Sequence, residues 1–168
     1  MAYVISRNLA GGQPISAVST TQKHGLLETV KAKDSSYGEG DFIYAKASAA
    51  ITTGSFVSID YATGFAQVVT DALAKASVGI IAKAEGTFAA DEWGWFMRQG
   101  TGLGRIKPAT EGNTALYVNA SAGVLGGTTL SNMVVGAVAV TSVTTTVGSV
   151  TCHINFPFIS RAESLLGQ

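Results

Sequence analysis

Cys152 and His153 come closest to a catalytic pair in this chain, because a thiol nucleophile needs a neighbouring base. They are adjacent within residues 149–156, which we predict to be a β-strand. Neighbouring side chains of a strand point to opposite faces. His24 is remote in the sequence. We therefore expect Cys152 to be a buried structural thiol and His153 a half-exposed imidazole, with no catalytic residues.

The glycines at 100, 102 and 104 superficially suggest a phosphate-binding loop. A dinucleotide fingerprint needs G-x-G-x-x-G at the start of a helix. Counting from Gly102, Lys107 replaces the third glycine and Pro108 follows, so we predict a hairpin turn instead. Asp91 and Glu92 are expected to be solvated loop charges, and two histidines with one cysteine are too few for a zinc site. The sequence thus predicts no enzyme, no cofactor and no metal.

Composition bounds the class of protein. Charged residues make up 13% of the 168 residues and the formal net charge is zero, whereas soluble domains usually carry ~25% charged residues. No run of basic residues indicates a nucleic-acid partner. No apolar run approaches the ~20 residues of a membrane span, and the N-terminus lacks the pattern of a signal peptide. Burial against other subunits would explain the low charge, because interface cores are depleted of charge.

Short alternating apolar segments predict an all-β fold, a compact antiparallel β-barrel or β-sandwich of about ten short strands. We expect an extended N-terminal arm over 1–25, this β-domain over 26–160 and a short C-terminal tail over 161–168. A helical turn is expected at 71–75 with Asp71 as its N-cap, and the segments 93–99 and 103–107 are expected to pair as a hairpin. The predicted strands are 26–32, 41–45, 54–60, 65–70, 77–84, 93–99, 103–107, 115–119, 133–141 and 149–156.

Glycines mark the expected turns and bends. Gly38 and Gly40 are predicted to take positive φ in the turn before the strand at 41–45. Gly64 closes the turn at 61–64 of a hairpin. Gly79, Gly94 and Gly136 fall inside predicted strands and indicate bulges or sharp bends.

The chain also contains a weak internal echo. The first half has Phe56-Val57, Gly64, Val78-Gly79 and Gly94-Trp95-Phe96, and the second half has Tyr117-Val118, Gly123, Val135-Gly136 and Gly148-Ser149-Val150. Both halves run strand, turn, strand with an internal Val-Gly, loop, strand. Chance is a rival explanation, because Val and Gly are common here. If the echo is real, it indicates two similar β-modules packed as one barrel or sandwich.

Aromatic residues supply the candidate interface. In a strand Trp93 and Trp95 share a face and Phe96 opposes them. One reading makes these rings core residues, another makes one face an anchor for a partner subunit, and a third, weaker reading makes them a sugar-binding groove. The N-terminal arm can be a disordered tail or a segment that orders on a neighbouring subunit. The candidate interface residues are Gln13, Pro14, Phe42, Tyr44, Trp93, Trp95 and Phe96.

One resemblance covers roughly residues 22–107. Its residues are Tyr37-Gly-Glu-Gly-Asp-Phe-Ile-Tyr44, Gly54-Ser-Phe-Val57, Val78-Gly-Ile80, Gly94-Trp-Phe96 and Gly100. This pattern resembles the small β-rich capsid decoration (cement) and head proteins of tailed bacteriophages. The resemblance implies a structural virion protein, made in the host cytoplasm and located on the capsid surface. Its implied partners are the major capsid protein and itself, as a homotrimer. A head fibre or spike that recognises host-surface glycans is the alternative.

Overall fold

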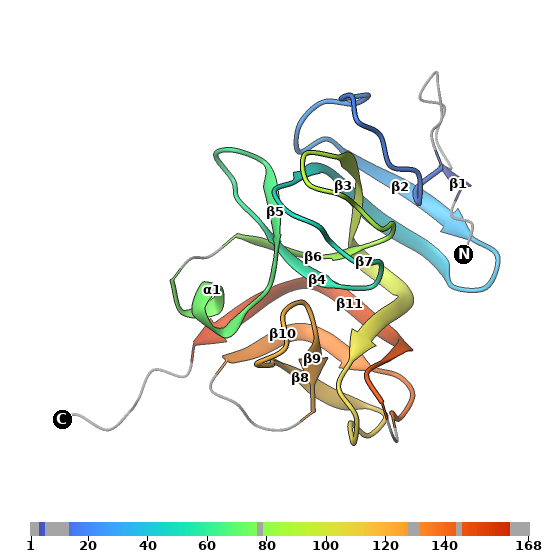
Figure 1. Ribbon diagram of the computed structural model, residues 1–168. Coiled ribbons are helices and arrows are strands. Elements are labelled where there is room, and N and C mark those ends of the chain that lie inside the picture. The colour runs from blue at the N-terminus through green and yellow to red at the C-terminus, as the bar shows by residue number, and fades with distance from the viewer. Residues whose placement is uncertain (1–3, 6–13, 77–78, 128–131, 144–145, 162–168) are drawn as a thin grey trace.

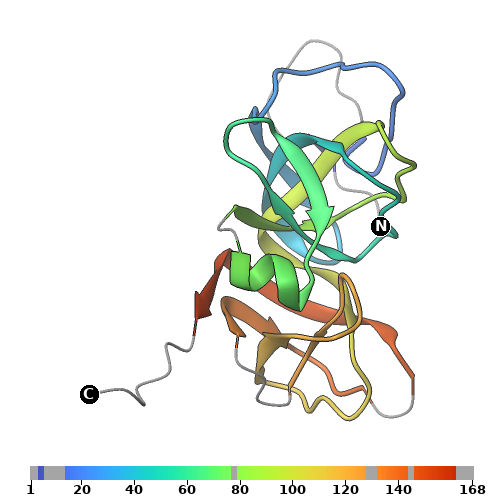
Figure 2. The same ribbon diagram turned by 60° about the vertical axis from the view of Figure 1, so that its left-hand side comes forward.

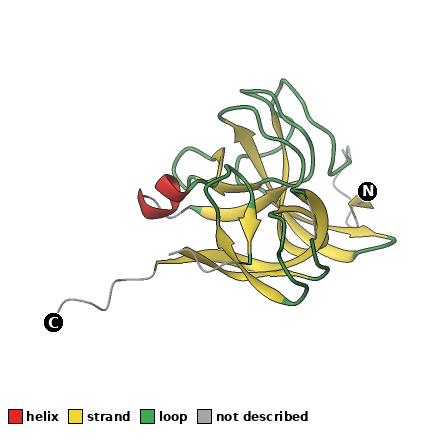
Figure 3. Ribbon diagram, turned by 60° about the horizontal axis from the view of Figure 1, so that its bottom comes forward, coloured by secondary structure: helices red, strands yellow, loops and turns green. Residues whose placement is uncertain are grey.

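The regular secondary structure of the chain is almost all β-strand. The computed structural model describes residues 4–5, 14–76, 79–127, 132–143 and 146–161, with 55% strand and 4% helix, which confirms the predicted all-β class. Figure 3 shows the short helix α1 (Asp71–Ala76) at the periphery of the strands. The elements are β1 (Val4–Ile5), β2 (Thr29–Asp34), β3 (Gly38–Ala47), β4 (Phe56–Ile59), β5 (Phe65–Val68), α1 (Asp71–Ala76), β6 (Ile80–Ala84), β7 (Trp93–Ile106), β8 (Thr114–Val118), β9 (Leu125–Gly126), β10 (Asn132–Ala139) and β11 (Gly148–Arg161).

Five strands close into a first barrel, called barrel 1 here. Its strand order is β3-β5-β4-β6-β7, and the additional pairing of β3 with β7 closes the ring. Alternation along each strand fills the inside with apolar side chains. On β3, for example, Ile43 and Ala45 belong to this core, whereas Phe42 and Tyr44 face the other way and join a second core. The predicted alternation of these residues is therefore confirmed.

Five strands also close a second barrel, barrel 2, which shares β7 with the first. Its order is β7-β11-β10-β8-β9, and a pairing of β7 with β9 closes it. Figures 1 and 2 show the two barrels one above the other, with β7 and β11 passing between them. The β3–β5 and β7–β9 pairs are parallel, so the sheet is mixed and not purely antiparallel as predicted.

The two barrels repeat the same pattern of pairing, which gives the sequence echo a structural basis. The parallel pair Ala47↔Ala66 of barrel 1 has its counterpart in Ile106↔Leu125 of barrel 2, an offset of 59 residues for both strands. The buried bridge Ile51↔Phe88 likewise has its counterpart in Thr110↔Val143. Gly64 and Gly123, matched in the sequence echo, also fall 59 residues apart and have φ of 66° and 70°.

The register of the echo differs by two residues from the one predicted. Phe56 pairs with Lys83 on β6, and the residue in the same position of barrel 2 is Ala115, which pairs with Val138 on β10. The sequence comparison had placed Tyr117 there instead. The fold is also two barrels that share a strand, and not one barrel or sandwich.

The predicted hairpin around Gly100 is wrong, because β7 runs unbroken from Trp93 to Ile106. Gly100 has φ of 130° and bends the strand without reversing it. At this bend one pairing of β7 ends and another begins. Gln99 is the last residue of β7 to pair with β3, at Asp41, and the first to pair with β11, at Asn155; the following residues continue along β11. The bend at Gly100 thus lets one strand, β7, belong to both barrels.

Residues 14–28 pack against barrel 1. Ile15 is buried in the core, and Ser19 forms a backbone bridge with Trp93. The amide of Lys23 donates a hydrogen bond to the hydroxyl of Tyr44 at 3.0 Å. The predicted arm over 1–25 therefore has to be corrected, because its described part from Pro14 onward belongs to the body of the molecule. At the other end, β11 extends to Arg161, and residues 162–168 of the predicted tail lie outside the described residues.

The glycine predictions have mixed outcomes. Gly38 and Gly136 have φ of 78° and 82°, and Gly136 lies at a break in the register of β10, as a bulge requires. Gly40 does not have positive φ; a side chain there would meet the carbonyl oxygen of Gln99 at 3.0 Å, so close strand approach explains this glycine. Gly79 precedes β6, where a Cβ would meet Ser58 Oγ at 2.4 Å.

The helix α1 follows its prediction over 71–75 except at the cap. Thr70 and not Asp71 is the N-cap, since the amide of Leu73 donates to Thr70 Oγ1 at 3.1 Å. Asp71 instead pairs with Lys75 at 2.5 Å and accepts a hydrogen bond from Asn132 Nδ2 at 3.1 Å. The hydrogen bond from Lys75 is the main cause of a lowered pKa at Asp71. Through Asn132, α1 ties barrel 1 to the start of β10.

Candidate functional site

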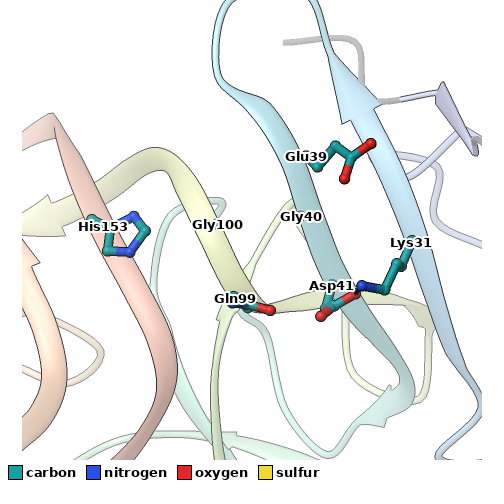
Figure 4. A pocket seen from close by; sticks show the side chains of 7 residues that line it. All are labelled: Lys31, Glu39, Gly40, Asp41, Gln99, Gly100 and His153. Carbon is teal, nitrogen blue, oxygen red and sulfur yellow. Dashed lines mark ion pairs between the residues drawn. The ribbon is translucent and has the colours of Figure 1, made fainter.

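A polar pocket lies where β2, β3, β7 and β11 run side by side. One row of paired residues crosses all four strands, and it consists of Lys31, Asp41, Gln99 and Asn155. The pocket encloses about 210 Å³. Figure 4 shows its side chains projecting from these strands, with Lys31 reaching toward Asp41 and His153 on the opposite side. The lining residues are Lys31, Glu39, Gly40, Asp41, Gln99, Gly100 and His153.

Glycines shape the floor of this pocket. A Cβ at Gly100 would lie 3.0 Å from the Cα of Gly40 and 3.2 Å from the carbonyl oxygen of Glu39. Any larger residue at either position would push β3 and β7 apart. The two strands therefore approach closely at the point where β7 leaves barrel 1, and the pocket is a consequence of that crossing.

The polar groups of the pocket suit hydrogen bonding more than catalysis. Lys31 Nζ lies 3.7 Å from Asp41 Oδ1, and His153 Nδ1 lies 3.1 Å from Thr101 Oγ1. Within the described part of the chain, no group of three or more His, Cys, Asp or Glu residues has the arrangement of a metal site. Cys152 is buried and His153 is exposed, so the two side chains diverge as predicted.

A second polar cluster, which sequence reasoning missed, lies buried between the barrels. Lys83 and Glu85 form an ion pair whose side chains are 0% and 2% exposed. Cys152 lies close by, and its thiol donates to the carbonyl oxygen of Gly102 at 3.4 Å. Burial raises the pKa of Cys152 to about 11. A Lys-x-Glu pattern inside an apolar strand was the available signal, since two charges on one face of a buried strand must find partners.

Four of the predicted interface residues are core residues. Phe42, Tyr44, Trp95 and Phe96 are each 0% exposed, so their side chains do not present a surface to a partner. The Tyr44 and Trp95 rings meet edge to face with centroids 5.0 Å apart. Burial is the main cause of a raised pKa at Tyr44. Trp95 therefore cannot line the aromatic groove that would have favoured a glycan-binding spike.

A surface patch on barrel 1 is defined here by four residues, which are Leu26, Lys46, Phe65 and Trp93. Leu26 and Phe65 are exposed, and Trp93 is half-buried and stacks on Tyr44 with ring centroids 6.1 Å apart. Lys46 Nζ lies 5.3 Å from the Phe65 ring centroid and 5.7 Å from that of Trp93. Asp91 holds this ammonium at 2.7 Å. The patch thus joins apolar rings around a neutralised cation.

The remaining predicted positions are Gln13, Pro14 and Glu92. Pro14 is exposed, and Gln13 lies outside the described residues. Glu92 accepts a hydrogen bond from the amide of Ala89 at 2.6 Å, which gives this loop carboxylate a structural partner. None of the helical structure in the described ranges has the length and apolar character of a membrane span.

Comparison of the chain with models of protein families, with curated proteins and with solved structures gives no match.

Proposed function

We propose that this protein is a structural virion protein, a capsid decoration (cement) protein. It binds the outside of the shell of major capsid protein in a tailed bacteriophage and stabilises the head. The resemblance over residues 22–107 supports the proposal, and these residues include all of barrel 1. The low charge of the chain fits a protein that buries much of its surface in an assembly.

The observation that carries the proposal is the patch of Leu26, Lys46, Phe65 and Trp93. Aromatic side chains are enriched at the centres of protein interfaces and supply much of their binding energy. Here the Phe65 and Trp93 rings lie on β5 and β7, and Lys46 lies on β3. These strands belong to a closed barrel, so little ordering of the side chains is needed on binding. This patch is the surface by which the protein would grip the capsid.

The mechanism would be the burial of several modest contacts across neighbouring capsid subunits. Linked contacts raise avidity by roughly 10² to 10⁴ over a single contact. A rigid body held at several points resists movement of those subunits apart, and this is how a bound protein would stabilise an expanded head against internal pressure.

The test is binding to undecorated capsids, measured by co-sedimentation. Phe65 is 40% exposed, so Phe65→Asp places a charge in the patch without filling or emptying the core. We expect wild-type protein to bind saturably and Phe65→Asp to bind at least about tenfold more weakly. Val147→Asp is the matched control, since Val147 is 43% exposed and outside the patch. Equal binding of all three proteins would remove the patch from the mechanism.

A further inference from the structure

The internal repeat identifies a second surface, on the far side of barrel 2. In barrel 1 a register row crosses β4, β6 and β7 as Phe56, Lys83 and Met97. All three residues are 0% exposed, because barrel 2 covers this outer wall of barrel 1. A Cβ at Gly104, inside barrel 2, would meet the Phe56 ring at 3.1 Å, which shows how close the two barrels lie.

The same row in barrel 2 is open to solvent in the described part of the chain. It crosses β8, β10 and β11 as Ala115, Val138 and His153, by the same pairs of strands. Ala115 and His153 are exposed and Val138 is half-buried. Val140, which corresponds to Glu85, is 40% exposed. The buried wall of barrel 1 thus carries the charged Lys83 and Glu85, and the equivalent open positions of barrel 2 carry Val138 and Val140.

β11 adds apolar surface beyond this row. Phe156 has φ of 43° and corresponds to Gly100, the bend at which β7 passes from one barrel into the next. β11 likewise continues past barrel 2, and its Phe156 and Phe158 are 47% and 53% exposed. Val135, the register partner of Phe158, is half-buried. Among the described residues, β8 and β10 contribute no charged side chain to this wall.

Proteins built from repeats normally end in a unit whose outer face is polar, because an uncovered repeat face is apolar and sticky. Barrel 2 does not follow that rule. Its open wall occupies the position of the barrel-to-barrel contact inside the chain, and β8 and β10 place no charged side chain on it. Charges lie at its margin, where the Arg98 guanidinium is 5.1 Å from the Phe156 ring centroid and His153 borders the polar pocket. Permanent contacts between identical chains are also the most apolar class of interface.

We infer that the outer wall of barrel 2, formed by Ala115, Val138, Val140, His153 and Phe158, is the contact surface with a second copy of this chain. The occupant follows from the fold: a β-barrel already covers the equivalent wall of barrel 1. The inference stands on the internal repeat and does not require the capsid role, so each can fail without the other.

The experiment is light scattering of the full chain across a range of concentrations. We expect an oligomer that dissociates on dilution. Phe158→Asp and, separately, Val140→Asp should weaken association at least about tenfold, as expected when an interface centre receives a charge. Tyr61→Asp is the control, because Tyr61 is 64% exposed on a turn of barrel 1 and should leave association unchanged.

Two outcomes would overturn the inference. One is a wild-type chain that stays monomeric at every concentration. If Phe158→Asp then loses capsid binding, the capsid protein and not a second copy covers this wall. The other is association that survives both substitutions in variants whose urea midpoints match wild type. Val140→Asp keeps the test valid if Phe158→Asp disturbs β11.

Discussion

The buried ion pair of Lys83 and Glu85 allows a quantitative prediction. Both side chains are almost completely removed from solvent, at 0% and 2% exposed. Removing one partner of a buried pair leaves the other charge uncompensated, at a cost of roughly 3–5 kcal/mol. Replacing both by apolar residues of similar volume is often neutral or stabilising. We therefore expect Glu85→Gln and Lys83→Met each to lower the free energy of unfolding by roughly 3–5 kcal/mol.

The assay is urea unfolding followed by tryptophan fluorescence, with thermal melts alongside. For a chain of this size, 1 kcal/mol corresponds to roughly 2–4 °C in Tm, so each single variant should lose roughly 6–20 °C. The double variant Lys83→Met/Glu85→Leu should recover most of that loss. Lys75→Met is the control, because Lys75 pairs with Asp71 at the surface, and its midpoint should match wild type.

Two results would refute this reasoning. A loss below roughly 1 kcal/mol in both single variants would mean that water reaches the pair. A double variant as unstable as the two single losses combined would mean that the side chains act separately and not as a pair. In the first case the junction between the barrels would be held by its apolar residues alone.

Three further predictions concern the turns, the thiol and the N-terminal segment. Asp60 accepts hydrogen bonds from the amide and the hydroxyl of Thr63 and from the amide of Ala62, and these bonds lower its pKa. Asn119 has the matching position in barrel 2, so Asp60→Asn should retain the melting temperature and Asp60→Ala should lower it. Because the pKa of Cys152 is raised from 9.0 to about 11, the unfolded chain loses this proton first and stability should fall as pH rises from 9 to 11; Cys152→Ala should flatten that part of the pH profile, and an unchanged slope would contradict the assignment. Deletion of residues 1–21 removes the buried Ile15 in addition to β1, and it should cost at least roughly 2 kcal/mol more in urea unfolding than deletion of residues 1–13, which removes β1 but keeps Ile15. Equal midpoints for the two truncations would show that Ile15 is not part of the core.

The sequence predicted strand positions well where the side chains alternate with the period of a strand. Phe42 and Tyr44 alternate with Ile43 and Ala45 as the period of a strand requires, although both faces proved to be buried. That burial is why the interface prediction failed: residues 14–28 cover the outward face, and a polar segment without periodicity gives no sign that it will pack. Ile15 is buried in the core, and the partly exposed Val18 and Leu27 pack against the core of barrel 1.

The bend at Gly100 could not be read from local pattern. Gly-Thr-Gly between two apolar runs is typical of a hairpin turn. Only the pairing with β11, which begins where the pairings of β7 with β3 and β6 end, shows that this strand is continuous. The repeat was visible in the sequence at Gly64 and Gly123, where positive φ restricts the residue to glycine. Elsewhere its register is set by backbone pairing, which many apolar residues satisfy equally, so the sequence placed the match two residues away.

The polar pocket was also beyond sequence reasoning. Lys31, Gln99 and His153 lie on three strands far apart in the chain, and only the register of the sheet brings them together. Local patterns carry little information about contacts between distant strands, because register depends on the whole sheet.

Binding to undecorated capsids tests the central proposal most directly. Purified protein is mixed with shells that lack it, and the bound amount is measured by co-sedimentation as the protein concentration rises. The proposal predicts saturable binding that Phe65→Asp weakens and Val147→Asp leaves intact. A protein that stays in the supernatant at every concentration, while remaining folded, would contradict a role as a capsid decoration protein.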